Sequence, residues 1–167
     1  MQKLFNNLSK LIKEEITQYR ELLSLLYHER EAIKKNSLDD IRHCTKMKET
    51  LTLKLKIMEE SRNALLERIA DHSKVKKEEL TVRKIAQIAP SSQAKEFKKY
   101  HEELTQLCGK IKELNAKNKA FVESSLLWVN TYMGFMNSLM NPNPVYLPTG
   151  KLNTGKTFKN RIIHKEA

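Results

Sequence analysis

Apolar residues recur at alternating spacings of three and four positions through the second half of the chain. The series runs Phe97, Tyr100, Leu104, Leu107, Ile111, Leu114, Asn118, Phe121, Ser125, Trp128, Tyr132, Phe135 and Leu139. This alternation persists for about six heptads and predicts one long helix over residues 92–140. At 1.5 Å per residue the helix would be roughly 70 Å long. Because a compact globule cannot bury one apolar stripe of that length, the pattern predicts long helical partners beside it.

The first half of the chain contains two further helical patterns. Apolar positions between Leu4 and Ile33 form one broad face, which predicts a helix over residues 3–35. A narrower heptad seam predicts a second helix over residues 37–71; its members are Ile41, Cys44, Lys48, Leu51, Leu55, Met58, Arg62, Leu65 and Ile69. Asn36 and Ser37 interrupt the two patterns, and Ser37 with Asp40 resembles a capping box. So short a connection predicts an antiparallel hairpin.

Residues 72–91 are expected to connect the hairpin to the long helix. They contain a short amphipathic pattern over residues 82–89, which Thr81 can cap and Pro90 can end. Ser91 or Ser92 is expected to cap the long helix, which Asn141 and the prolines after it should stop.

The remaining residues, 141–167, are rich in Pro, Gly, Asn, Thr and Lys and show no periodicity. We therefore expect a flexible basic tail over 141–167 and a helical domain over 1–140. The predicted class is all-α: an elongated antiparallel helical hairpin or bundle with coiled-coil-like seams and one long C-terminal helix.

Composition supports long helices and does not favour a nucleic-acid-binding surface. The chain has 167 residues, of which 31% are charged, and only four are Gly and four are Pro, whereas the turns of a β-sandwich would need more of both. The formal net charge is +11. Acidic residues are nevertheless interleaved with basic ones at helical pairing distance: Glu31 with Lys35, Glu59 with Arg62, and Glu113 with Lys117. That pattern is typical of solvated helix faces and not of a clustered phosphate-binding stripe.

The cysteines and the N-terminus favour a cytoplasmic protein. Cys44 and Cys108 lie on different predicted helices and form neither a disulfide framework nor a metal-binding spacing, so free thiols in a reducing compartment are expected. Charged residues interrupt the apolar N-terminal positions, so no signal peptide is expected, and no apolar run reaches membrane-spanning length.

The lengths of the predicted helices give the first indication of function. The long helix exceeds each helix of the hairpin by some 15 residues, or roughly 20 Å, so part of its seam lacks an obvious partner within the chain. If it runs antiparallel to the second helix, the excess lies at its C-terminal end, where aromatic and methionine side chains are concentrated. Such a face suits capture of another helix. Self-association and a folded-back core are the alternatives.

The chain contains partial matches to catalytic and cofactor-binding motifs, but the residues around each match do not fit the motif. Gly150, Gly155, Lys156 and Thr157 satisfy the written pattern of a phosphate-binding loop, but no strand precedes them and only ten residues follow. No histidine has the spacing of a di-iron bundle, and Thr105 occupies the position of the second histidine in a zinc-protease pattern. We expect no enzyme activity, no cofactor and no metal.

Two stretches resemble the FlgN-like flagellar export chaperones. The first has a leucine-rich run with a glutamate, a short break near a Leu-Asp pair and a second leucine seam; its residues are Leu22, Leu23, Leu25, Leu26, Glu29, Arg30, Ala32, Ile33, Asp39, Ile41, Lys46, Lys48, Leu51 and Arg62. The second is similar to the family's Leu-Asn-x-x-Asn stretch and the Tyr-x-x-x-Gly element after it; its residues are Leu114, Asn115, Asn118, Phe121, Val122, Ser125, Leu126, Val129, Tyr146 and Gly150. The resemblance covers most of residues 15–150, and the basic tail after Gly150 departs from it, as do Pro142 and Pro144.

The resemblance implies a small cytoplasmic chaperone of the flagellar type III export system. Such chaperones bind the C-terminal helical segments of hook-filament junction proteins, prevent their premature assembly and deliver them to the membrane export gate. The expected client-binding residues are Asn115, Asn118, Phe121, Trp128, Tyr132, Phe135 and Leu139, with the two asparagines setting register. By resemblance Tyr146 is the candidate for docking to the export gate. A structural coiled-coil scaffold or homo-oligomer without a client is the competing interpretation.

Overall fold

The computed structural model describes residues 1–73 and 80–140 and contains, within those ranges, four helices and no strands. Helix α1 spans Gln2–Lys34, α2 spans Leu38–Ser73, α3 spans Val82–Ile88 and α4 spans Ser91–Met140. The predicted all-α class is confirmed, and each helix begins and ends within two residues of its predicted bounds. Residues 74–79 and the predicted tail, 141–167, lie outside the described residues.

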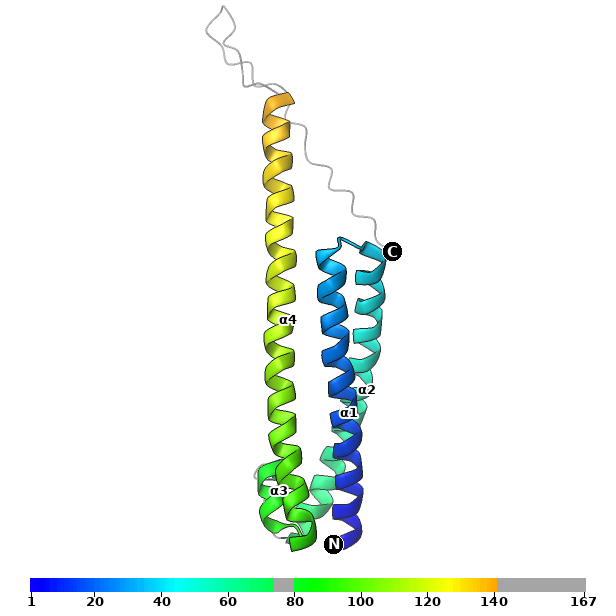
Figure 1. Ribbon diagram of the computed structural model, residues 1–167. Coiled ribbons are helices and arrows are strands. Elements are labelled where there is room, and N and C mark those ends of the chain that lie inside the picture. Colours follow the sequence, from blue (N-terminus) through cyan, green and yellow to red (C-terminus); the bar gives the residue numbers. More distant parts are fainter. Residues whose placement is uncertain (74–79, 141–167) are drawn as a thin grey trace, which may run out of the picture. The chain divides into compact units, whose positions relative to one another are not determined.

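Helices α1 and α2 form the expected antiparallel hairpin, and a tight turn at Asn36 joins them (Figure 1). Asn36 has φ 53°, in the left-handed region that asparagine adopts more readily than most residues. The N–H of Asn36 donates to the carbonyl of Ile33, and that of Ser37 donates to the carbonyl of Ala32. These two bonds form a Schellman motif, which satisfies carbonyls at the end of α1 and reverses the chain within three residues.

The residues predicted to begin and end α3 do so, whereas the residue predicted to cap α4 does not. Thr81 caps α3 as predicted, because its side chain accepts a hydrogen bond from the backbone N–H of Lys84. Ala89 ends α3 in an extended conformation, as expected for the residue before Pro90. The predicted serine cap of α4 is wrong by one position. Ser91 is already helical, and the carbonyl of Pro90 accepts the bonds from Gln93 and Ala94.

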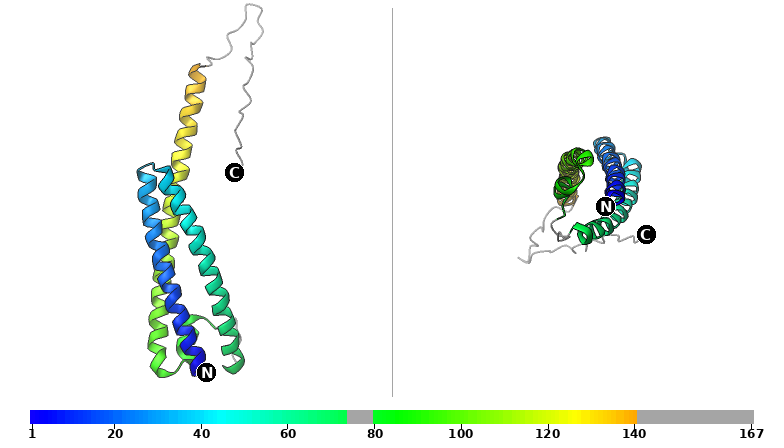
Figure 2. Two further views of the ribbon diagram at one scale, coloured as in Figure 1. Left: turned by 90° about the vertical axis from the view of Figure 1, so that its right-hand side faces the viewer. Right: turned by 90° about the horizontal axis from the view of Figure 1, so that it is seen from below.

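The chain divides into two compact units, Met1–Val122 and Glu123–Ala167, so the boundary falls inside α4. The first unit contains α1, α2, α3 and α4 as far as Val122. Within it, α4 runs parallel to α1, since Gln2 bonds Gln93 at one end and the carbonyl of Leu26 accepts from Asn118 further along. The end view in Figure 2 shows the helices of this unit side by side. Of the second unit, the structure describes only residues 123–140.

The hydrophobic core of the first unit gathers at the N-terminal end of α1. Phe5, Leu8 and Ile12 are almost completely buried, together with Ile85 of α3 and Phe97 of α4. The ring of Phe97 lies edge-on to that of Phe5, with centroids 6.3 Å apart, and edge-on to that of Tyr100, at 6.0 Å. Such pairs stabilise a core beyond their buried area. This cluster attaches α3 and the first turns of α4 to α1.

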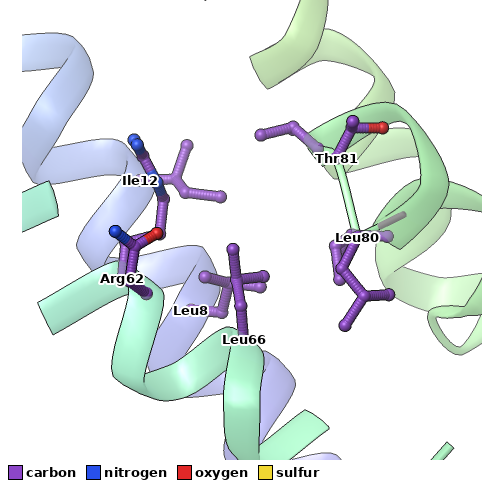
Figure 3. Close-up of a pocket in the computed structure, with 9 residues that line it drawn as sticks. Leu8, Ile12, Arg62, Leu66, Leu80 and Thr81 are labelled. Carbon is purple, nitrogen blue, oxygen red and sulfur yellow. The ribbon is translucent and has the colours of Figure 1, made fainter. Parts of the chain in front are cut away.

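A cavity of about 260 Å³ lies between α1, α2 and the start of α3. Figure 3 shows Leu8 and Ile12 on α1, Leu66 and Arg62 on α2, and Leu80 just before α3 around it. Its walls are mainly aliphatic, and Leu80 is buried there.

Polar contacts cross the packed helices at several levels, two of which involve buried glutamates of α1. Glu15 on α1 is 1% exposed and accepts a hydrogen bond of 2.6 Å from Arg62 on α2. Further along, Glu29 on α1 accepts from Lys48 on α2 at 2.5 Å and from Asn118 on α4 at 3.1 Å. The second layer therefore joins α1, α2 and α4 at one level. Buried polar contacts of this kind favour one helix register over its alternatives.

The heptad seam predicted for α2 is confirmed by burial, since every member from Ile41 to Ile69 is buried or half-buried. The predicted surface pairs are confirmed at Glu113 with Lys117, 2.6 Å apart, and at Glu59 with Arg62, 3.6 Å apart. Glu31 pairs at 2.7 Å with Lys34, one residue before the expected Lys35.

Candidate functional site

The apolar seam of α4 changes from buried to exposed near residue 118. Phe97, Tyr100, Leu107, Leu114 and Asn118 are all buried. The next seam position, Phe121, is 51% exposed. Because α1 ends at Lys34, and Phe121 lies against Arg30, Ile33 and Lys34, the helix that covers the seam ends at this level. Phe121 is the last seam residue of the first unit.

The described part of the second unit, residues 123–140, exposes most of its large apolar side chains. We call these residues the apolar surface of α4: Leu126, Leu127, Trp128, Val129, Tyr132, Met133, Phe135, Leu139 and Met140. Trp128 and Met140 are each 74% exposed. Isolated exposed apolar residues are ordinary, but a contiguous group of this size marks an interaction surface.

The apolar surface has no charged side chain. Glu123 is the last charged residue before Met140, and the polar residues between them are Ser124, Ser125, Asn130, Thr131, Asn137 and Ser138. Glycine at position 134 adds a stretch of bare helix backbone. None of the described helices combines the length and the hydropathy that crossing a membrane requires.

This surface is chemically suited to packing against another helix. Trp128, Tyr132, Phe135 and Leu139 follow one another at spacings of four, three and four residues, which places them along one side of α4. Met133 and Met140 are unbranched and can adapt to an irregular partner. Complete burial of one such side chain stabilises a complex by about 1.5–3 kcal/mol. Several such side chains buried together offset much of the entropy that is lost on association.

The two asparagines that were predicted as client-binding residues have different environments. Asn118 is 4% exposed, and its amide donates to the backbone carbonyl of Leu26 at 2.9 Å and to Glu29. It therefore connects α4 to α1 within the chain and can set the register between these two helices. Asn115 is exposed, three residues earlier on the same helix. Asn115 and Asn118 belong to the first unit, whereas Trp128 and Phe135 belong to the second, and the role of all four in client binding stays a prediction.

Several predicted features lie outside the described residues. Tyr146 is one of them, and so are Gly150 and the Lys156 pattern. Among residues 1–73 and 80–140, no group of three His, Cys, Asp or Glu side chains is placed to hold a metal ion. Cys44 is buried, Cys108 is exposed, and both are free thiols.

Comparison with known proteins gives one family. A family model described as FlgN protein matches residues 1–154, which include all four helices and Tyr146. No curated protein and no solved structure matches the chain significantly.

Proposed function

The chain belongs to the FlgN family, whose members are flagellar export chaperones, and from this premise we propose what it binds and where it delivers its client. It is a cytoplasmic chaperone that holds the C-terminal helical segments of hook-filament junction proteins. It prevents these segments from assembling prematurely and brings them to the type III export gate. No catalytic step is part of this function.

The observation that carries the proposal is the exposed, uncharged apolar surface of α4. A client segment that is disordered before assembly exposes apolar side chains, which must be covered to keep it soluble. Packing of such a segment as a helix along Trp128, Tyr132, Phe135 and Leu139 covers both partners at once. Ordering of the client segment on binding costs conformational entropy, which lowers the affinity of the complex. The chaperone can therefore hold the client and still release it.

Calorimetric titration with the C-terminal helical segment of a junction protein from the same organism tests the proposal. We expect saturable binding with a negative change in heat capacity, because apolar surface is buried. Replacing both Trp128 and Phe135 by Ala should weaken binding by about 3 kcal/mol, or roughly a hundredfold, as truncation of aromatic hot spots does. Helicity measured by circular dichroism should change little, since both side chains are exposed.

A matched control is available on α2, where Leu53 and Ile57 are 61% and 56% exposed. Their double replacement by Ala removes exposed apolar area from another helix and should leave client affinity unchanged. The proposal fails if both double variants bind equally well. A native chain that binds no client and forms a stable self-assembled rod would instead support the scaffold interpretation.

Delivery to the export gate is assigned to Tyr146 by family resemblance. The Tyr146→Ala variant should bind the client segment with the native affinity. It should bind the cytoplasmic part of the export gate more weakly than the native chain does. A loss of client binding in this variant would argue that Tyr146 belongs to the client-binding surface. The proposal thus separates holding the client from docking at the gate.

A further inference from the structure

A recess of about 380 Å³ lies between α3 and the first turns of α4, within the first unit. Figure 1 shows the two helices beside each other at this end. Small side chains, Ala86 of α3 and Ala94 of α4, leave space at its base. Long basic side chains line it on both sides: Arg83 from α3, and Lys95 and Lys98 from α4. We call it the α3–α4 recess.

The cations around the recess are not neutralised by the described part of the chain. Arg83, Lys95 and Lys98 form no ion pair with any residue in 1–73 or 80–140. On the side of α4 that faces α1, by contrast, Glu96 pairs with Lys13 at 3.1 Å and Glu103 pairs with Arg20. The recess therefore combines small apolar residues with cations that have no ion-pair partner among residues 1–73 and 80–140.

One carboxylate and one imidazole complete the lining. Glu102 is exposed and His101 is half-buried, and both follow the lysines on α4. Among the described residues that line the recess, three cationic side chains accompany one carboxylate, so this lining has an excess of positive charge.

The packing of α3 holds the recess open before any ligand arrives. Ile85 is completely buried in the core, next to Phe97 on α4. The Thr81 cap fixes the first turn of α3, and the extended backbone at Ala89 fixes the reversal into α4. A site formed by anchored helices loses little entropy when it binds a ligand.

From this chemistry we propose that the α3–α4 recess is a second docking site, distinct from the apolar surface of α4, for an acidic peptide segment of a protein partner. The segment inserts an aliphatic side chain over Ala86 and Ala94. Its carboxylates accept charge-assisted hydrogen bonds from Arg83, Lys95 and Lys98. A nucleic-acid backbone is a poorer match, because its phosphates follow an extended basic stripe and have no use for a small apolar base.

A fluorescein-labelled synthetic peptide provides the probe for the full-length chain. It has about twelve residues, with two leucines four positions apart and glutamates flanking them, so that it forms an acidic amphipathic helix. Fluorescence anisotropy should show saturable binding. Peptides with glutamine in place of glutamate, or serine in place of leucine, should each bind much more weakly. Amide chemical-shift changes in the protein should centre on residues 83–87 and 94–102.

Charge reversal of Arg83, Lys95 and Lys98 to Glu should lower the affinity at least about tenfold, as expected for the loss of three favourable charge pairs. The matched control reverses Lys46, Lys54 and Lys56, which are exposed on α2. This control changes the net charge equally and should lower the affinity less than about threefold. Equal losses in both triple variants would show attraction to the net charge only and overturn the proposal.

A second variant changes the shape of the recess without changing its charge. Ala94→Leu fills the base and should weaken peptide binding while the circular dichroism spectrum and the binding of the junction-protein segment stay native. The proposal is overturned if this variant binds the peptide normally. It is also overturned if the shift changes centre on residues 126–140, or if a single-stranded oligonucleotide displaces the peptide at the recess.

Discussion

At the scale of single residues, the buried ion pair between Glu15 and Arg62 couples stability to pH. Burial raises the pKa of Glu15 above its ordinary value of 4.5, although the Arg62 guanidinium acts in the opposite direction. A carboxyl group whose pKa is raised on folding favours the native state below its unfolded pKa, and that contribution is lost as the pH rises through the folded pKa. At neutral pH, Glu15 is therefore tolerated because Arg62 compensates its charge.

Replacing Arg62 by Met should make this dependence visible. At about pH 7 the variant should lose about 3 kcal/mol of stability, because a buried carboxylate is left without its cation. Near pH 4 the loss should be much smaller, because Glu15 then takes up a proton. Urea unfolding at the two pH values measures the difference. Adding Glu15→Gln to the same chain should remove the pH dependence, and an equal loss at both pH values would contradict the argument.

At the scale of helices, Asn115 and Asn118 on α4 allow a matched comparison. Asn118→Ala removes two hydrogen bonds to α1 and should lower the free energy of unfolding by about 1–2 kcal/mol. Asn115→Ala should be neutral or slightly stabilising, because Asn115 is exposed and Ala has the higher helix propensity. Urea unfolding of the two variants in parallel tests this. Equal effects would mean that the polar layer at Asn118 adds nothing to the packing of α4.

The helices themselves could be predicted from sequence because their signals are local. Heptad spacing, Thr81 and Pro90 each act within a few residues, so the helix bounds agree with prediction to within two positions. The burial of Asn118 could not be predicted in this way, since the same Asn-x-x-Asn pattern suits either a partner-facing or an internal seam. Whether the asparagine faces a partner or the interior depends on where α1 ends along α4. The burial of Glu15 was likewise missed, because a charged side chain is not expected on the apolar face of a helix.

At the scale of the whole molecule, the described residues of the two units have different compositions and burial. All the buried core residues belong to Met1–Val122, whereas residues 123–140 are exposed except for the half-buried Met136. That α4 would be longer than α1 and α2 was predictable from the sequence pattern alone. The α3–α4 recess could not be predicted from the sequence. Arg83 and Lys98 line it together because the chain reverses at Pro90, and no periodic pattern indicates this.

A chain that ends at Val122 tests this division. It retains the complete core, so its urea midpoint should lie close to that of the full-length chain. It lacks the apolar surface of α4 and should no longer bind the junction-protein segment, but it should still bind the acidic peptide. Loss of cooperative unfolding in the shortened chain would show that residues after Val122 stabilise the core.

The parallel alignment of α1 and α4 has a consequence for the order of folding. Contacts between α1 and α2 include the hydrogen bond of Glu29 with Lys48, which are only 19 positions apart, and can close progressively outward from the Asn36 turn. By contrast, the hydrogen bonds of α1 with α4 at Arg20–Glu103 and Leu26–Asn118 join residues 83 and 92 positions apart. The first of these contacts bears nearly the whole loop-closure entropy, and the later ones add almost none. We therefore expect the part of α4 before Glu123 to dock on a preformed hairpin in a single late step, and to be released in the same way.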